Sequence, residues 1–117
     1  MTQKREAKDS SALEFLLATI AGSVIGGLLG FILWNGCFIS ALWVEEAVRR
    51  KGIGKRLLAM PEKVATQTQC QHVHLDTFDF QAPGFYEKQG CRVFGTISDY
   101  PMAHKRYYLV KHLGEIG

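Results

Sequence analysis

One short segment of the chain combines closely spaced positive charges with two glycines. Five of the 14 lysine and arginine residues lie within residues 49–56, Arg-Arg-Lys-Gly-Ile-Gly-Lys-Arg, and an apolar pattern with helical spacing follows. The first N–H groups of a helix have no partner inside the helix, and the helix dipole adds partial positive charge there. Gly52 and Gly54 carry no Cβ atom, so an anion can approach their backbone closely. We therefore predict that this segment binds an anionic group such as a diphosphate.

Histidine and cysteine spacing argues against metal chemistry. His72, His74 and Asp76 alternate along one predicted strand and share a face, but three ligands on a single strand lie too far apart to surround one ion. The cysteines are odd in number and have no CxxC spacing: Cys37, Cys70 and Cys91. We expect neither a metal site nor a disulfide, and free thiols fit a reducing cytoplasm.

The composition is that of an ordinary globular domain. Of 117 residues, 47% are hydrophobic and 21% are charged, which excludes a disordered or low-complexity chain. The formal net charge is only +3, whereas nucleic-acid-binding domains normally carry a denser basic surface. We expect one domain over residues 13–117, preceded by a polar tail over residues 1–12, and no nucleic-acid partner.

The glycine segment also resembles motif A of the GNAT N-acetyltransferase superfamily. That motif reads Gln or Arg, two residues, Gly, one residue, then Gly or Ala, and Arg49, Gly52 and Gly54 carry it here. A second stretch, Phe-Tyr-Glu-Lys-Gln-Gly-Cys at residues 85–91, is similar to the F-Y-E-K-x-G segment of the same family. The two motifs follow in the family's order, and the resemblance covers about residues 13–113.

The resemblance implies a binding site for acetyl-CoA. In this family the cofactor lies where two parallel strands separate. Its pantetheine arm pairs with the strand before motif A, and the motif A loop holds its pyrophosphate. Carried over to this chain, the cofactor-binding residues are Leu42, Trp43, Val44, Arg49, Arg50, Lys51, Gly52, Ile53, Gly54 and Lys55.

The resemblance also implies the catalytic groups. The tyrosine of the second motif often lies near the thioester sulfur and protonates the departing thiolate, and its position here is Tyr86. A pKa of about 10 suits a tyrosine to that role, and burial in the core is the alternative interpretation. The main-chain N–H of Val44 is the candidate for binding the oxyanion. The base that deprotonates the amine is Glu45, Glu46 or Asp76, among which the sequence does not decide.

Two interpretations compete for the apolar stretch at residues 13–34. As one helix, with Gly22, Gly26 and Gly30 on one side, it is long enough to span a membrane. As two strands, it turns at residues 21–23, and Asn35-Gly36 then gives a strong hairpin signal before a third β-rich stretch. The three-stranded meander explains both turn signals, so we predict the meander.

Helices and strands alternate in the rest of the chain. We predict a helix over residues 52–70, which Pro61 either kinks or divides into two shorter helices. A strand, a short helix and two further strands are predicted at residues 71–77, 83–89, 91–98 and 107–113. This order predicts an α/β fold with a mixed, mostly antiparallel sheet and flanking helices. The resemblance adds a splayed pair of parallel strands, as in the acyl-CoA N-acyltransferase-like fold.

The chain departs from the family on its N-terminal side. The usual first strand and the two helices after it, which build much of the acceptor pocket, are not recognised, and an exposed sheet edge and apolar face favour a homodimer. The resemblance implies an N-acetyltransferase that uses acetyl-CoA to acetylate a primary amine of a small molecule or peptide, and the cysteine usage favours a cytoplasmic location. No cysteine is placed to carry the acetyl group, so we expect direct attack in a ternary complex. The alternatives are a truncated, non-catalytic CoA-binding or assembly module, and a single-span membrane protein.

Overall fold

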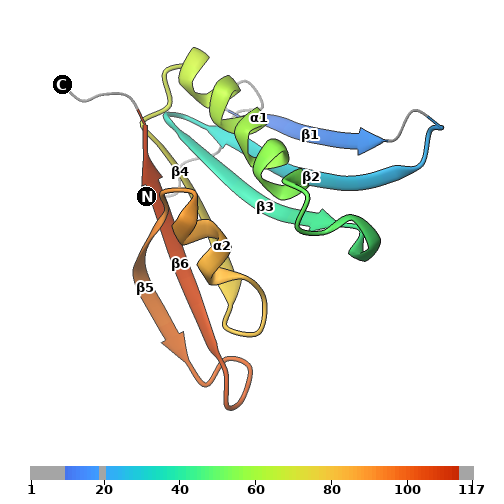
Figure 1. Cartoon of the computed structure of the whole chain (residues 1–117). Coiled ribbons are helices and arrows are strands. Elements are labelled where there is room, and N and C mark those ends of the chain that lie inside the picture. The colour runs from blue at the N-terminus through green and yellow to red at the C-terminus, as the bar shows by residue number, and fades with distance from the viewer. Residues whose placement is uncertain (1–9, 19–20, 114–117) are drawn as a thin grey trace.

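The computed structural model describes residues 10–18 and 21–113, which form a six-stranded sheet with two α-helices (Figure 1). In this part of the chain β3 and β4 run parallel, and the other neighbouring strands run antiparallel. The order across the sheet is β1-β2-β3-β4-β6-β5. The strands are β1 (Ser10–Ala18), β2 (Val24–Leu33), β3 (Gly36–Val44), β4 (His72–Phe78), β5 (Arg92–Ser98) and β6 (Lys105–His112). The predicted mixed, mostly antiparallel sheet is confirmed.

The apolar stretch at residues 13–34 forms two antiparallel strands. Leu13, Phe15 and Leu17 alternate with more exposed neighbours and pack against the core, as expected for strands with one buried face. The single-helix interpretation is therefore wrong, and no helix in the described residues is long and apolar enough to span a membrane.

The turn between β2 and β3 lies one residue earlier than the Asn35-Gly36 signal indicates. Its residues are Trp34 and Asn35, and Trp34 adopts the left-handed conformation with a φ of 54°. Gly36 instead opens β3, where a Cβ atom would lie 2.8 Å from Nε2 of His72. Close approach of the neighbouring strand, and not the turn itself, therefore requires this glycine.

Two helices cover one face of the sheet. α1 (Ile53–Gln67) connects β3 to β4, and α2 (Pro83–Lys88) follows β4. α1 continues through Pro61, so of the two predicted alternatives, a kink or a division into two shorter helices, the division is wrong. The Pro61 ring is fully buried, and its packing offsets the main-chain hydrogen bond that proline cannot donate.

The core lies between the two helices and the sheet. Its most deeply buried side chains come from every central strand and from α1: Leu28, Cys37, Ile39, Leu57, Leu58, Val73, Leu75 and Leu109. Along β4 the buried residues alternate with His72, His74 and Asp76, which face the opposite side of the sheet. The three cysteines are buried free thiols.

Element boundaries differ from the predicted ones by a few residues. β1 begins at Ser10, inside the predicted polar tail, and residues 1–9 of that tail lie outside the described part of the chain. The long helix ends at Gln67 rather than at residue 70, because Gln69 adopts a left-handed φ of 64°. β6 begins at Lys105, two residues earlier than predicted.

Candidate active site

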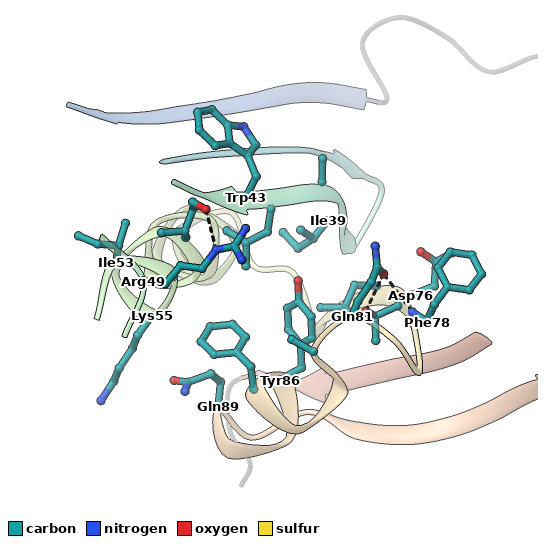
Figure 2. A pocket seen from close by; sticks show the side chains of 18 of the residues that line it. Ile39, Trp43, Arg49, Ile53, Lys55, Asp76, Phe78, Gln81, Tyr86 and Gln89 are labelled. Carbon is teal, nitrogen blue, oxygen red and sulfur yellow. Dashed lines mark hydrogen bonds between the residues drawn. The ribbon is translucent and has the colours of Figure 1, made fainter. Parts of the chain in front are cut away.

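A cleft opens where β3 and β4 separate. The two strands pair over residues 36–39 and 72–75, and beyond the last pair, Ile39 with Leu75, they diverge. The space between them, about 1110 Å³, is bounded by β3, the start of α1, β4 and α2 (Figure 2). The parallel pair is thus splayed, as the fold class requires.

Main-chain groups of β3 face this cleft at alternate residues. Val44 is opposite Gly26 of β2, and the N–H of Glu45 donates to the Ile25 carbonyl at 2.8 Å. In an antiparallel ladder this pattern makes Gly26 and Val44 a non-hydrogen-bonded pair, so the N–H and C=O of Val44 point away from β2. The same applies to Leu42, two residues earlier. Both residues therefore offer main-chain donors and acceptors to the cleft.

Trp43 borders the cleft between Leu42 and Val44, but its main-chain N–H and C=O point toward Gly27 of β2 and its side chain lies elsewhere. The indole crosses the face of the sheet opposite α1, where a Cβ atom on Gly27 would lie 2.7 Å from its Nε1 atom. Figure 2 shows the ring directed across the sheet and away from the other labelled side chains. The tryptophan is therefore part of the strand's packing.

The N-terminus of α1 forms one end of the cleft. Gly52 precedes the helix with a left-handed φ of 79°, and no side chain caps the first turn. The first helical main-chain bond is donated by Arg56 to the Gly52 carbonyl at 3.0 Å, which leaves the preceding N–H groups of the turn without helical partners. The first turn holds no acidic residue, and Lys55 lines the cleft beside it. These features favour an anion at this end of the cleft.

Arg49 braces the loop before α1. Its Nε atom donates to the carbonyl oxygen of Val44 at 3.0 Å, which ties the end of β3 to the helix start. Nine of the ten predicted cofactor residues line the cleft, and Lys51 does not. Gly54 has a packing role, because a Cβ atom there would lie 3.2 Å from Cζ of Phe85 and press on α2.

Tyr86 lies in the wall formed by α2, with its hydroxyl directed into the cleft (Figure 2). The Phe85 ring packs against it at 5.1 Å between centroids. Burial, reinforced by the nearby Cys91 and Asp76, raises the pKa of Tyr86 to about 12. The phenol therefore keeps its proton throughout the physiological range, as a proton or hydrogen-bond donor must.

Of the three candidate bases, only Asp76 lines the cleft in the described structure. One of its carboxylate oxygens accepts a hydrogen bond from Nη2 of Arg106, and this ion pair raises the pKa of the arginine. Glu45 and Glu46 follow the end of β3 as exposed residues and are not brought to the cleft.

The His72, His74 and Asp76 face is occupied by ring packing. The His74 ring lies 5.0 Å from His72 and 5.2 Å from Phe38, and burial together with His72 lowers its pKa. Within residues 10–18 and 21–113, no cluster of three or more His, Cys, Asp or Glu side chains is arranged to hold a metal ion.

Several cleft residues were not anticipated from the sequence, because they lie in the connection after β4. Phe80 and Gln81 line the cleft from this connection, Phe85 does so from α2, and Gln89 does so from the position just after α2. The Phe78 and Phe80 rings stack with centroids 5.3 Å apart. No sequence signal marks Gln81, because the side chains that commonly bond back to the nearby main chain are the shorter Ser, Thr, Asn and Asp.

Comparison with known proteins agrees with this geometry. Residues 2–91 match the acetyltransferase (GNAT) family. Blasticidin-S acetyltransferase of Streptomyces morookaense is 40% identical over 93 residues, which are 79% of this chain and 68% of that protein. A crystal structure of an acetyltransferase from Bacillus cereus superposes with a TM-score of 0.86 at 35% identity, covering 89% of this chain and 74% of the other.

A more distant neighbour carries a ligand. The N-acetyltransferase of Thermoplasma acidophilum, solved in complex with coenzyme A, has a TM-score of 0.74 at 23% identity and covers 87% of this chain and 61% of that one. It shares the fold. The family match, the 40% identical relative and the splayed strand pair lead to one conclusion: this chain belongs to the GNAT family of acetyltransferases.

Proposed function

We propose that this protein is a cytoplasmic N-acetyltransferase that transfers the acetyl group of acetyl-CoA to a primary amine by direct attack in a ternary complex. The observation that carries the proposal is one continuous cleft with three kinds of group. It has an uncapped helix start at one end, inward-facing main-chain groups along β3, and a protonated tyrosine hydroxyl on the opposite wall. The buried free thiols fit a reducing compartment.

The helix start and β3 fit the cosubstrate. The N–H groups of the first turn of α1, with Lys55 and Arg49 beside them, would hold the diphosphate. A Cβ atom at Gly52 would have nothing within 4 Å, so space for a phosphate exists directly above this residue. The inward-facing N–H and C=O groups of Leu42 would pair with the amide groups of the pantetheine arm, while the Val44 N–H is left for the acetyl carbonyl oxygen.

Each catalytic role is assigned to a group that faces the cleft. Acetyl-CoA supplies a thioester, in which the C–S bond breaks while the amine nitrogen forms the new C–N bond. The Val44 N–H would stabilise the negative charge that develops on the carbonyl oxygen. The Tyr86 hydroxyl would donate a hydrogen bond to the departing sulfur as negative charge develops there. Asp76, held in place by Arg106, would accept the proton of the attacking amine directly or through water.

The binding step is tested by adding a negative charge at the proposed diphosphate site. Gly52→Glu and Gly52→Gln impose the same side-chain size and the same strain at a φ of 79°, but only glutamate adds charge. One charge about 5 Å from the two charges of a diphosphate costs about 1.7 kcal/mol even in a largely aqueous setting. Titration calorimetry should therefore show CoA binding at least about tenfold weaker to Gly52→Glu than to Gly52→Gln. Equal affinities would remove the diphosphate assignment.

The catalytic step is tested separately. Release of free thiol from acetyl-CoA is followed with a panel of primary amines, and the proposed function requires amine-dependent release. CoA binding without any release would identify a non-catalytic CoA-binding module instead. This outcome needs consideration because the aligned residues span 68% of the length of the Streptomyces relative.

We also propose that a second copy covers the sheet face opposite the helices. Large apolar side chains are exposed on this face, Leu16 at 56%, Leu29 at 45% and Phe94 at 57%, and β1 is an edge strand. Leu29→Lys should shift sedimentation from dimer toward monomer. Met102→Lys, which changes an equally apolar exposed residue in the β5–β6 loop, should not. A monomeric wild-type protein would refute the proposal.

A further inference from the structure

The side chain of Gln81 is held in a fixed orientation at one end of the cleft. Its Oε1 atom accepts two hydrogen bonds, from the Thr77 hydroxyl at 3.0 Å and from the Phe78 N–H at 3.0 Å. Its own main-chain N–H donates to the Phe78 carbonyl at 2.9 Å, which closes the turn after β4. Side chain and main chain of this residue are therefore both anchored to the end of the strand.

This anchoring determines which atom the amide offers to the cleft. A main-chain N–H is a donor only, so the amide atom that meets Phe78 must be the oxygen and not the nitrogen. The NH₂ group consequently points the other way, and Figure 2 shows the nitrogen of Gln81 directed into the cleft. Among the described residues, no protein acceptor is bonded to this NH₂ group.

Gln81 lies away from the diphosphate end of the cleft. In Figure 2, Tyr86 stands between Gln81 on one side and Arg49 and Lys55 on the other. If the Tyr86 hydroxyl faces the thioester, Gln81 faces the space beyond it, where the amine must enter. Asp76 and the stacked rings of Phe78 and Phe80 line the same end.

We propose that Gln81 is an acceptor-binding residue, which selects amines that carry a carbonyl oxygen next to the amino group. Its NH₂ group donates to that carbonyl, while Asp76 receives the amino group and the Phe78–Phe80 pair contacts a flat apolar part of the acceptor. The acceptor class is then an aminoacyl amide or a related amine, rather than a simple alkylamine. This inference rests on the proposed acetyl transfer and names the substrate class of that site.

The test compares two amines that differ by one carboxamide. Phenylalaninamide and phenethylamine have the same ring and spacing to nitrogen, and at about pH 6 both are cationic. Calorimetry on the CoA-loaded protein measures their affinities, and thiol release from acetyl-CoA measures kcat and KM. One neutral hydrogen bond to the carbonyl should make phenylalaninamide about five- to tenfold the better ligand for the wild-type protein.

Gln81→Glu removes the donor but keeps the turn, because a carboxylate still accepts from Thr77 and Phe78. In this variant the preference for phenylalaninamide should disappear. The KM for the amine should change, and the KM for acetyl-CoA should stay the same. Gln89→Glu places the same new charge elsewhere in the cleft, so it should retain the preference. Thermal unfolding of both variants confirms that the fold is intact.

The possible results separate two failures. An undiminished preference in Gln81→Glu, equal affinity of the wild-type protein for both amines, or CoA-loaded protein that binds neither amine would each overturn the role of Gln81. Failure of the wild-type protein to bind CoA would instead refute the proposed function.

Discussion

Replacement of Tyr86 by phenylalanine tests the proposed chemistry with little disturbance to the fold. The variant lacks one oxygen atom, and within the described residues the Tyr86 hydroxyl has no hydrogen-bond partner whose loss would destabilise the protein. The ring packing against Phe85, at 5.1 Å between centroids, is retained. A change in turnover therefore reports on the hydroxyl itself.

The size of the effect follows from the raised pKa. With a pKa of about 12, the Tyr86 phenol is protonated at every pH at which the enzyme works. A free thiol has a pKa near 8.5, so complete proton transfer from this phenol to a free thiolate is uphill by about 5 kcal/mol. Tyr86 should therefore act mainly as a hydrogen-bond donor to the developing charge. Loss of one such donor lowers kcat by about 100-fold or more, which corresponds to roughly 3 kcal/mol.

The assay is thiol release from acetyl-CoA with the best amine of a panel, at saturating amine, in wild-type protein and Tyr86→Phe. kcat should fall by about 100-fold, while the calorimetric affinity for CoA stays within about twofold. Tyr86 does not ionise below about pH 10. Raising the pH up to that value should therefore not lower the wild-type rate relative to the rate of the phenylalanine variant. A variant whose kcat remains within about threefold of wild type would show that the hydroxyl takes no part in the departure of sulfur.

Three further predictions concern stability and reactivity. Gly30→Ala should lower the free energy of unfolding in urea by about 2 kcal/mol or more, because its Cβ atom would collide with the Phe38 carbonyl oxygen. The control Gly84→Ala places a Cβ atom in open space on a helix and should be neutral or stabilising. Burial raises the pKa of Cys37 to about 11, so at pH 8 only about a thousandth of it is thiolate, and iodoacetamide should label it far more slowly in folded than in urea-unfolded protein. Because the pKa of Tyr86 is raised in the folded protein, this tyrosine ionises at lower pH in the unfolded chain. Between pH 10 and pH 12 the unfolding free energy of the wild-type protein should therefore fall by on the order of 2 kcal/mol more than that of Tyr86→Phe. Equal losses in the two proteins would contradict this assignment.

The helix start where we propose that the diphosphate binds could be predicted from sequence, because its determinants are local. Gly52 allows the left-handed φ before α1, and the charges of the loop lie within a few residues of it. The meander was likewise predictable, because turn signals and alternation along a strand are short-range patterns. Tyr86 required the family resemblance, since a tyrosine on an amphipathic helix does not reveal whether it faces the core or a cleft.

How Asp76 is held at the acceptor end could not be predicted, because the contacts around it join distant residues. Asp76 meets Arg106 through the β4–β6 register, 30 positions apart, and Asp79 meets His104 at 2.9 Å in the same way. Neither pair has a signature along the chain. The same limitation explains the misplaced β2–β3 turn, since the reason for Gly36 is the His72 ring on another strand.

The cleft itself follows from an irregularity in the meander. Leu29 is paired with Ala41 and Gly30 with Ile39, so Ser40 is an extra residue of β3 with no partner in β2. Such a bulge bends the strand that carries it and increases its twist. Ile39 is also the last residue of β3 that pairs with β4, so the bend turns β3 away from β4 immediately after their final shared pair.

Gly30 permits this bulge, because any side chain there would meet the main chain of Phe38. In the helical interpretation of the same stretch, this glycine belonged to a packing face within a membrane. In the sheet it has a different consequence: it allows β3 to bend and so leaves the inner edges of β3 and β4 without strand partners beyond Ile39 and Leu75. The main-chain groups of Leu42 and Val44 on that edge are the ones that the proposed function assigns to the cosubstrate. The residue that creates the binding edge therefore lies on a strand that does not line the cleft.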